Sequence, residues 1–245
     1  MSKTRHEPAV RGYAVTQPAG RAAIPVDSGW DQLLCTVTGA MTVRTSTDTW
    51  VVPARRALWL PGGQPATVQT RGRTAVRTLY LDEDLRRLPD DARVLDLTPL
   101  ARELVDHVVS VCPLELRSDG DRALLTVLLD QLDALPASPL RLSMPIDPRA
   151  RDAAATLLDD PARSIDGLSA VVGASRRTLE RRFRGETGLT LAAWHRRARA
   201  LRALELLADG TTVTETAHAV GYSTPSSFVA SFKAETGSTP GTFRS

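Results

Sequence analysis

The chain has few of the residues that build metal centres and disulfide frameworks. Its 245 residues include only two cysteines and four histidines, and these are scattered along the sequence. Cys35 and Cys112 cannot form a disulfide framework, and their spacing fits no metal-binding pattern. The sequence therefore excludes a disulfide-rich secreted domain, predicts no bound metal or other cofactor, and favours a reducing cytoplasm.

Long apolar runs and catalytic constellations are also lacking. No stretch approaches the ~18 apolar residues of a membrane span, and the start MSKTRHEPAV has no apolar core of a signal peptide. No Ser/His/Asp or Cys/His arrangement and no glycine-rich phosphate loop can be assembled, so we identify no catalytic residue. With 42% apolar and 24% charged residues, the composition is typical of a soluble globular protein long enough for two domains.

Positive charge is concentrated in one window. The formal net charge is only +3, but residues 175–202 hold nine arginines against Glu180 and Glu186. That window has a net charge of 9 − 2 = +7, so the remaining chain has 3 − 7 = −4. Such a stripe is either a solvated face or a surface for a polyanion, and composition alone leaves both open.

The sequence divides into segments of different texture, and together they predict an α+β protein. Residues 1–17 are polar and predict a flexible tail, whereas short β-branched runs cut by Gly and Pro predict a small barrel or sandwich over 18–82. Residues 83–135 are helical, with helices expected at 98–111 and 119–135. The proline-rich segment 136–147 is the best linker candidate, and it leads into a helical domain over 148–245.

A hexapeptide occurs twice in the helical domain. FRGETG (183–188) and FKAETG (232–237) lie 49 positions apart, and their surroundings repeat as well. Each copy follows a short helix, a tight turn containing glycine and a second capped helix. The expected caps are Ser164, Ser175, Thr190, Thr212 and Ser223, and Gly188, Gly210 and Gly237 are expected to end helices.

A short helix, a turn with glycine and a second capped helix make a helix-turn-helix motif. The second helix of such a motif fits the major groove of DNA. The repeated hexapeptide is then the C-terminal end of each recognition helix, with phenylalanine as core anchor and glycine as stop. Two motifs on one rigid helix can present two recognition helices about one DNA turn, ~34 Å, apart.

These residues also resemble a known family. The segment SRRTLERRFRGETG, then Trp194 and Arg199, then GYSTPSSFVASFKAETGSTP are similar to the DNA-binding domain of AraC/XylS-type transcription regulators. The resemblance covers roughly residues 150–244. It implies a bacterial regulator, near the nucleoid, that binds double-stranded promoter DNA and recruits or blocks RNA polymerase.

The resemblance places the base-reading positions of the first recognition helix on Arg177, Glu180 and Arg181. Arginine pairs bidentately with guanine and glutamate accepts from cytosine. Residues expected at the DNA backbone are Ser175, Arg176 and Arg184. For Arg196, Arg197 and Arg199 two alternatives stay open: they contact DNA, or they are solvated or paired with carboxylates such as Glu205.

The second recognition helix departs from the family pattern, because its outward positions hold no Arg, Asn or Gln. In many relatives an arginine stands where this chain has Ala230. The sequence therefore predicts asymmetric reading, with hydrogen-bonded specificity from the first motif only. From the second motif we expect backbone contacts, made by Ser223, Thr224, Ser226, Ser227 and Lys233.

The β segment resembles the cupin-type sensor domain that precedes such DNA-binding domains. Cupin enzymes hold a metal through H-x-H-x3-E and a later P-x-G-x2-H, but Val26, Ser28 and Ala66 occupy the histidine positions here, with Gln32 at the carboxylate. Imidazole, thiolate or carboxylate is needed there, so the resemblance implies a barrel without a metal. The alternative is a cupin-type metal-dependent enzyme with a DNA-binding appendage.

A small-molecule effector is a further expectation. Trp30, Gln32 and Trp59 are the candidates to line its pocket inside the barrel, with Trp50, Arg44 and Arg77 also available. A second possibility is that the barrel only dimerises the chain and binds no effector. Apolar stripes on the helices at 98–111 and 119–135 make a homodimer plausible under either reading.

Overall fold

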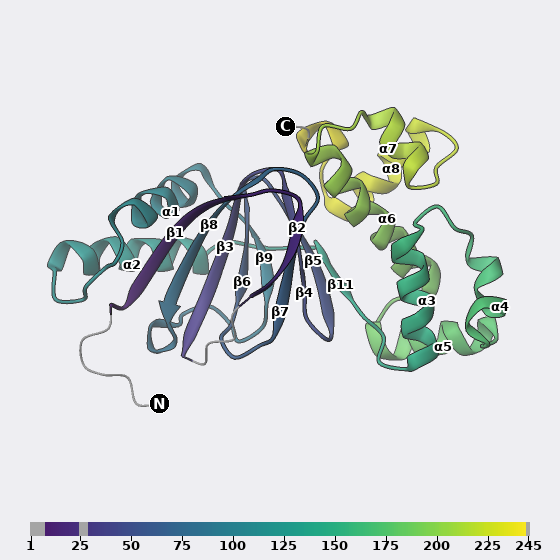
Figure 1. Cartoon of the computed structure of the whole chain (residues 1–245), viewed down its shortest axis with the longest axis horizontal. Helices are drawn as coiled ribbons and strands as arrows, with labels where there is room; N and C mark the ends of the chain where they lie inside the picture. The colour runs from purple at the N-terminus through teal and green to yellow at the C-terminus, as the bar shows by residue number, and fades with distance from the viewer. Residues whose placement is uncertain (1–7, 25–28, 244–245) are drawn as a thin grey trace. The chain divides into compact units, whose positions relative to one another are not determined.

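The computed structural model describes residues 8–24 and 29–243, and it confirms a mixed α+β architecture (Figure 1). Strands fill the first part of the chain, and helices follow. The strands are β1 (Val10–Gln17), β2 (Gly20–Ile24), β3 (Trp30–Thr38), β4 (Ala40–Arg44), β5 (Asp48–Pro53), β6 (Arg56–Leu60), β7 (Ala66–Thr70), β8 (Thr74–Asp82), β9 (Arg93–Asp96), β10 (Ala137–Ser138) and β11 (Arg141–Ser143). The helices are α1 (Pro99–Val111), α2 (Asp119–Asp133), α3 (Pro148–Asp159), α4 (Leu168–Val172), α5 (Arg176–Thr187), α6 (Leu191–Ala208), α7 (Val213–Ala219) and α8 (Pro225–Thr236), with 3-10 turns η1 (Glu83–Leu85), η2 (Ile165–Gly167) and η3 (Pro240–Phe243).

The described strands form two sheets rather than one closed barrel. One sheet has the order β1-β8-β3-β6-β9-β10, and the other has the order β11-β5-β4-β7-β2. The pairings within the six-stranded sheet are antiparallel. Among the described strands, β1 and β10 are the edges of the first sheet, and β11 and β2 are the edges of the second. The cupin-like barrel of the sequence prediction is replaced by this two-sheet arrangement.

The N-terminal segment differs from its prediction. Residues 1–7 lie outside the described part of the chain, but Val10–Gln17 forms β1, so the prediction of a flexible tail is wrong there. This strand pairs along its whole length with β8, from Val10 opposite Leu81 to Gln17 opposite Thr74. The strand VRGYAVTQ shows no regular alternation of apolar and polar residues, because it is an edge strand whose residues 13–16 are exposed.

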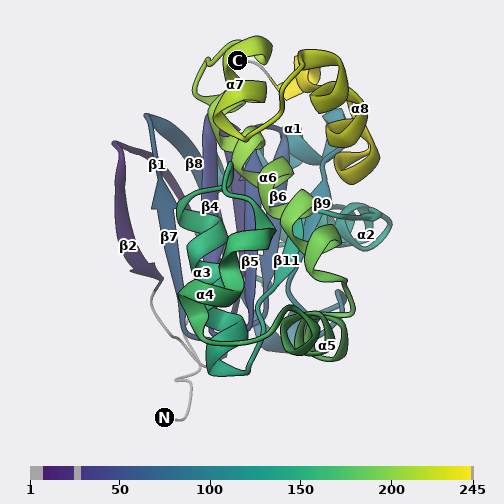
Figure 2. The ribbon, with the colours of Figure 1, turned by 90° about the vertical axis from the view of Figure 1, so that its right-hand side faces the viewer.

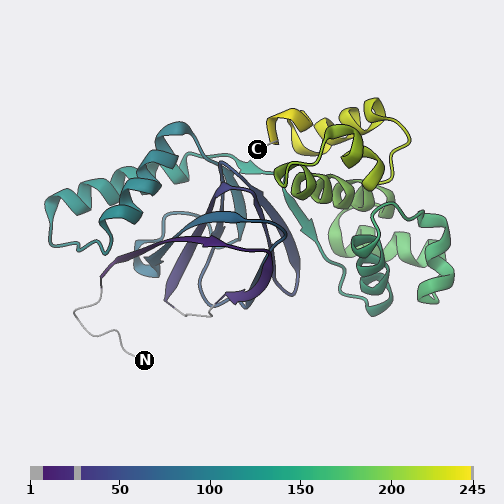
Figure 3. The same ribbon diagram turned by 45° about the horizontal axis from the view of Figure 1, so that its top comes forward.

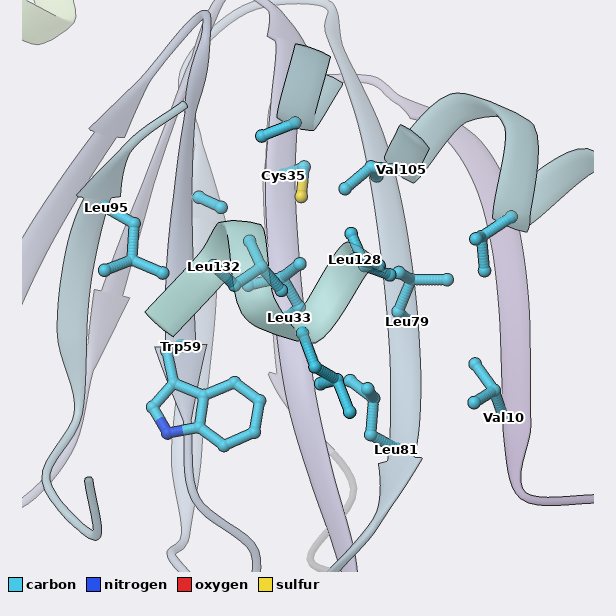
Figure 4. Packing of buried hydrophobic residues seen from close by; sticks show 14 of the residues in the cluster. Val10, Leu33, Cys35, Trp59, Leu79, Leu81, Leu95, Val105, Leu128 and Leu132 are labelled. Carbon is cyan, nitrogen blue, oxygen red and sulfur yellow. The ribbon is translucent and has the colours of Figure 1, made fainter. Parts of the chain in front are cut away.

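The core of the six-stranded sheet lies against α1 and α2, which run beside each other along one face of it (Figures 1 and 3). Side chains alternate along each strand, so one face of the sheet gathers the apolar residues. Leu33 and Leu79 of the sheet meet Val105 of α1 and Leu128 of α2 in this layer (Figure 4). Each fully buried side chain of this size contributes about 1.5–3 kcal/mol to folding.

Both helices begin where the sequence predicts. Thr98 caps α1 by accepting the Ala101 N–H, with Pro99 at the first helical position. Ser118 caps α2 by accepting the Asp121 N–H. Proline is favoured at a helix start because the N–H it lacks would have no intrahelical partner.

Contacts along the chain divide it into two compact units that differ from the predicted domains. One unit holds residues 1–41 and 54–138, and the other holds residues 42–53 and 139–245. The second unit includes residues 42–53 because Trp50 of β5 pairs with Arg141 of β11, just before α3. The predicted linker 136–147 therefore contains strands β10 and β11, which were hidden by their shortness and their prolines.

In the helical unit, α6 is the central element. It lies between the group α3, α4 and α5 and the group α7 and α8 (Figure 2). Buried side chains point to both groups from its 18 residues, which span about 27 Å. The Trp194 Nε1–H also donates to the Ser143 carbonyl at 2.8 Å, and the Thr42 hydroxyl donates to the Glu205 carboxylate, so β11 and β4 are both fastened to α6.

Candidate DNA-binding site

The first helix-turn-helix motif consists of α4, a turn and α5. Gly173 takes a left-handed conformation with φ 63° at the turn, where a residue with a Cβ would be strained. The Ser175 hydroxyl caps α5 by accepting the Thr178 N–H at 3.2 Å. Phe183 is fully buried, and its ring packs edge-on against Trp194 of α6 with centroids 5.3 Å apart. The recognition helix α5 is therefore held on α6 by its inner face.

The second motif consists of α7, a turn and α8, and it is built in the same way. Thr212 and Glu215 form a reciprocal capping box at the start of α7. The N-cap of α8 is Thr224 and not the predicted Ser223, because Pro225 occupies the first helical position and Thr224 accepts the Ser227 N–H. The 49-residue repeat agrees with this correction, since Ser175 plus 49 is Thr224.

The repeated hexapeptide makes the same contacts in both copies. The Thr187 hydroxyl donates to the Phe183 carbonyl at 2.7 Å, and the Thr236 hydroxyl donates to the Phe232 carbonyl at 2.9 Å. Each threonine then accepts the N–H two residues further on, and the glycine that follows it ends the helix with a positive φ. The phenylalanine, threonine and glycine of the hexapeptide are thus scaffold, whereas its second residue, Arg184 in one copy and Lys233 in the other, is exposed.

The glutamates of the hexapeptide fasten each motif to its surroundings. Glu186 accepts the backbone N–H groups of Ile146 and Asp147, at 2.7 and 2.9 Å, at the start of α3. Glu235 pairs with Arg197 at 3.2 Å and with Arg196 at 3.7 Å, which ties α8 to α6. These two roles were not found from the sequence, although the repeated E-T-G was a sign of them.

Three arginines form an exposed row on α5, which we call the α5 arginine row. Arg177, Arg181 and Arg184 are spaced by four and then three residues, so they lie on one face of the helix. All three side chains are exposed, and none of them forms an ion pair with another of the described residues. The row spans about 10 Å along the helix axis, at 1.5 Å per residue.

The other arginines of the basic window are used within the protein. On α5, Arg176 pairs with Asp166 at 2.5 Å and Arg182 pairs with Asp147 at 3.2 Å. On α6, Arg202 pairs with Glu205 at 2.8 Å. For Arg196 and Arg197 the paired alternative holds, with Glu235 as the partner in place of Glu205.

Arg199 contacts the turn between α7 and α8. Its guanidinium donates to the Val220 carbonyl and lies over the Tyr222 ring, 3.9 Å from the centroid. Burial lowers the pKa of Arg199, and Tyr222 opposes that shift. A half-buried arginine stacked on an aromatic ring supports the turn between α7 and α8, so Arg199 is not available to the duplex.

Glu180 is half-buried at the edge of the α5 arginine row. Its carboxylate accepts the Leu191 N–H at 3.2 Å, at the first turn of α6. A carboxylate there complements the unpaired N–H groups and the positive end of the helix dipole. Glu180 therefore positions α6 against α5, a contact that the spacing of residues along one helix could not reveal.

The outward face of α8 has a different chemistry. Ser226, Ala230 and Lys233 are exposed, and Val229 is half-buried. The Ser227 hydroxyl is occupied locally, since it donates to the Thr224 carbonyl at 2.9 Å. The positions that match Arg177, Arg181 and Arg184 after 49 residues are Ser226, Ala230 and Lys233, so one cation stands where the first motif has three.

The residues predicted for an effector pocket are not brought together. Trp59 lies opposite Leu33 in the six-stranded sheet and packs in the helix-covered core, where its Nε1–H donates to the Pro89 carbonyl at 3.1 Å. Gln32 is the neighbour of Leu33 on β3, so its side chain points to the other face of the sheet. Trp30, two residues before Gln32, points to that same face. Arg11 lies over the Trp30 ring, 4.4 Å from its centroid.

The cupin metal frame falls partly outside the described residues, since Val26 and Ser28 are not covered. Gln32 stands on β3 and Ala66 on β7, in different sheets. Among residues 8–24 and 29–243 no group of three His, Cys, Asp or Glu side chains could hold a metal ion. Within the same residues, every helix is too short or too polar to cross a membrane.

Comparisons with known proteins find helix-turn-helix relatives. Residues 168–245 match a family model described as a helix-turn-helix domain. Over 242 residues the chain is 27% identical to the HTH-type transcriptional regulator NimR of Escherichia coli, covering 98% of this chain and 89% of that protein. It is 34% identical over 113 residues to the HTH-type transcriptional regulator RipA of Corynebacterium glutamicum, covering 45% of this chain and 33% of that protein.

Among solved structures, the DNA-binding domain of the global transcriptional factor AdpA, in complex with a target DNA, is similar at 30% identity with a TM-score of 0.36. That match covers 39% of this chain and 89% of the solved chain. The sequence similarities thus relate the chain to HTH-type transcriptional regulators, and residues 168–245, which hold the doubled motif, match the helix-turn-helix domain.

Proposed function

We propose that the chain controls transcription by binding promoter DNA with α5 in the major groove and α8 against the same face of the duplex. The α5 arginine row is the observation that carries this proposal. The row presents three exposed guanidinium groups on one face of the second helix of a helix-turn-helix motif. Such groups can form hydrogen bonds with guanine edges in the major groove and with phosphates. We assign the chain no catalytic role, and we place its activity in the cytoplasm.

Within the row, Arg177 and Arg181 are the proposed base readers. They lie in the first half of α5, the part of a recognition helix that contacts base edges. Glu180, which stands between them, is the third proposed base reader, and one oxygen of its carboxylate also accepts the Leu191 N–H. Arg184, Arg176 and the capped N-terminus at Ser175 are proposed to contact phosphates, with Arg176 first leaving Asp166.

The second motif is proposed to add affinity with little base discrimination. Hydroxyl groups and backbone N–H groups at a helix start contact phosphate oxygens without reading sequence. The proposed contacts are Ser223, Thr224, Ser226, Ser227 and Lys233. Because α6 spans about 27 Å between the motifs, α5 and α8 can occupy grooves about one DNA turn apart.

The test begins with selection of duplexes from a randomised pool by the full chain. A selected duplex and a scrambled one are then titrated by fluorescence anisotropy over a series of salt concentrations. We expect the selected duplex to bind at least about 10³-fold more tightly than the scrambled one. Affinity should fall steeply as salt rises, because bound arginines release counterions. Absence of any enriched sequence would contradict the proposal.

The β-rich unit is proposed as the regulatory part of the chain, a cupin-related sensor that responds to a small molecule and brings two copies together. Leu100 and Val111 of α1 and Val127 of α2 are large apolar side chains with 54%, 44% and 46% of their surface exposed. Such residues on adjacent helices favour a second copy as partner. Sedimentation of the full chain should show a dimer, and Val127→Lys should yield a monomer. RNA polymerase is the proposed target of the DNA-bound form.

A further inference from the structure

A small cavity lies under the first half of α1, on the helix side of the six-stranded sheet. Its volume is about 160 Å³, and its floor is formed by Cys35 and Val37 of β3 with Leu97 and Val105. Cys35 and Val105 stand at one end of the helix-covered core (Figure 4). This cavity is separate from the pocket predicted from Trp30, Gln32 and Trp59, because none of these three residues lines it.

The rim of the cavity carries more positive than negative charge. Three guanidinium groups, from Arg55, Arg77 and Arg102, face two carboxylates, from Glu103 and Asp106. Arg77 Nε is 2.8 Å from Asp106 Oδ1, and both side chains are partly exposed. Burial raises the pKa of the Cys35 thiol, with Asp106 adding to the shift and Arg77 opposing it, so the floor stays uncharged. The result is an apolar floor below a net charge of 3 − 2 = +1.

Arg55 reaches the rim from a strained backbone. Its φ of 69° is in the left-handed region, and among the described residues it is the one non-glycine residue with a positive φ. A glycine would adopt this conformation without a penalty. The Arg55 N–H donates to the Thr36 carbonyl at 3.0 Å, which holds the turn beside the cavity. The short turn between β5 and β6 thus places the Arg55 side chain at the cavity.

We propose that this cavity binds a small organic monocarboxylate, which is the effector class for the regulatory unit. Arginine matches a carboxylate with two parallel hydrogen bonds, and Val37, Leu97 and Val105 would cover an apolar body. A cavity of about 160 Å³ has room for a small organic acid. The ligand carboxylate replaces Asp106 at Arg77, so binding frees α1 from the contact that holds it to β8.

This inference deepens the effector part of the proposed function, and binding can be measured without DNA. The full chain is titrated with hexanoate and with its neutral counterpart hexanamide, using calorimetry and ligand-observed NMR. We expect hexanoate to bind at least about ten-fold more tightly than hexanamide. Arg77→Met should weaken hexanoate binding about ten-fold or more, whereas Asp106→Asn should strengthen it by releasing Arg77.

Two variants separate this effect from a general structural one. Asp130→Asn breaks a similar ion pair, between Arg87 and α2, at a residue that does not line the cavity, and it should leave hexanoate binding unchanged. Arg55→Gly relieves the backbone, so its melting temperature should not fall while hexanoate binding weakens. Equal binding of acid and amide, or weaker binding by Asp106→Asn, would overturn the proposal. So would absence of binding at about 10 mM hexanoate. Each result can occur whether or not the chain binds DNA.

Discussion

The two helix-turn-helix motifs share their inner construction and differ on their outer faces. Thr187 and Thr236 make the same pair of hydrogen bonds, and Phe183 and Phe232 are buried anchors at matching positions. Outside, the first motif presents the α5 arginine row, while the second has Ser226, Ala230 and Lys233 at the matching positions. Folding constrains the inner residues of both copies alike, whereas the outer residues are free to differ in DNA chemistry.

The largest expected effect tests the shared construction. Phe183→Ala and Phe232→Ala should each lower the free energy of unfolding by about 3–5 kcal/mol, because each leaves a cavity among packed aromatic rings. Chemical denaturation of the full chain, followed by circular dichroism, measures both. A loss confined to one of the two variants would show that the copies are not equivalent as scaffold.

The next effect tests the difference between the outer faces. Arg181→Ala should cost about 1–3 kcal/mol of binding free energy on the selected duplex and relax one base position. Lys233→Ala should weaken all duplexes alike and reduce the salt slope by about 1. Anisotropy titrations against single-base variants of the site distinguish the two patterns. A base-specific loss from Lys233→Ala and a uniform loss from Arg181→Ala would reverse the assignment.

Ala230→Arg is the matched gain-of-contact variant. It places a guanidinium in the second motif at the position that corresponds to Arg181. We expect tighter binding to duplexes with guanine in the second half-site, by about 1 kcal/mol or more. If affinity rises equally for every duplex, α8 does not lie in the groove.

A smaller effect concerns the caps of the two recognition helices. Ser175→Ala and Thr224→Ala should each lower the free energy of unfolding by about 1 kcal/mol, because each removes the acceptor for a backbone N–H. Ser223→Ala, the control, should change it by less than about 0.5 kcal/mol. A larger loss from Ser223→Ala than from Thr224→Ala would restore the original assignment of the cap.

The smallest effect is a pH dependence on the side of α6 near α3. His195 shares a hydrogen bond of 2.9 Å with the Pro161 carbonyl, and burial lowers the pKa of its imidazole. The folded state then binds a proton less readily than the unfolded state, so stability should fall as the pH drops below about 6.5. His195→Gln should flatten this part of a plot of melting temperature against pH. An unchanged plot would show that other groups dominate.

Much of the helical unit could be predicted from sequence, because caps, glycine stops and apolar spacing are local. Thr98, Ser175 and Gly188 stand where the predicted elements begin and end. The β-rich part was harder, since edge strand β1 and short strands β10 and β11 have no apolar alternation to reveal them.

For the candidate site, residue types predicted which helix carries the charge, but they did not predict pairing. Arg182, Arg197 and Arg202 look like Arg181 in the sequence, and only their distances to carboxylates on other segments distinguish them. The contact of Glu180 with the start of α6 is of the same kind. Such contacts join residues that are far apart in the sequence, so they depend on tertiary packing and cannot be predicted from the local pattern of residues.

The most direct test of unequal reading is the base preference of the full chain across both half-sites of the duplexes selected from the randomised pool. We predict one strongly specified half-site, contacted by α5, and a second half-site about one turn away that tolerates most bases. Two half-sites specified equally would contradict the account, because α8 offers too few hydrogen-bonding side chains to read the second one.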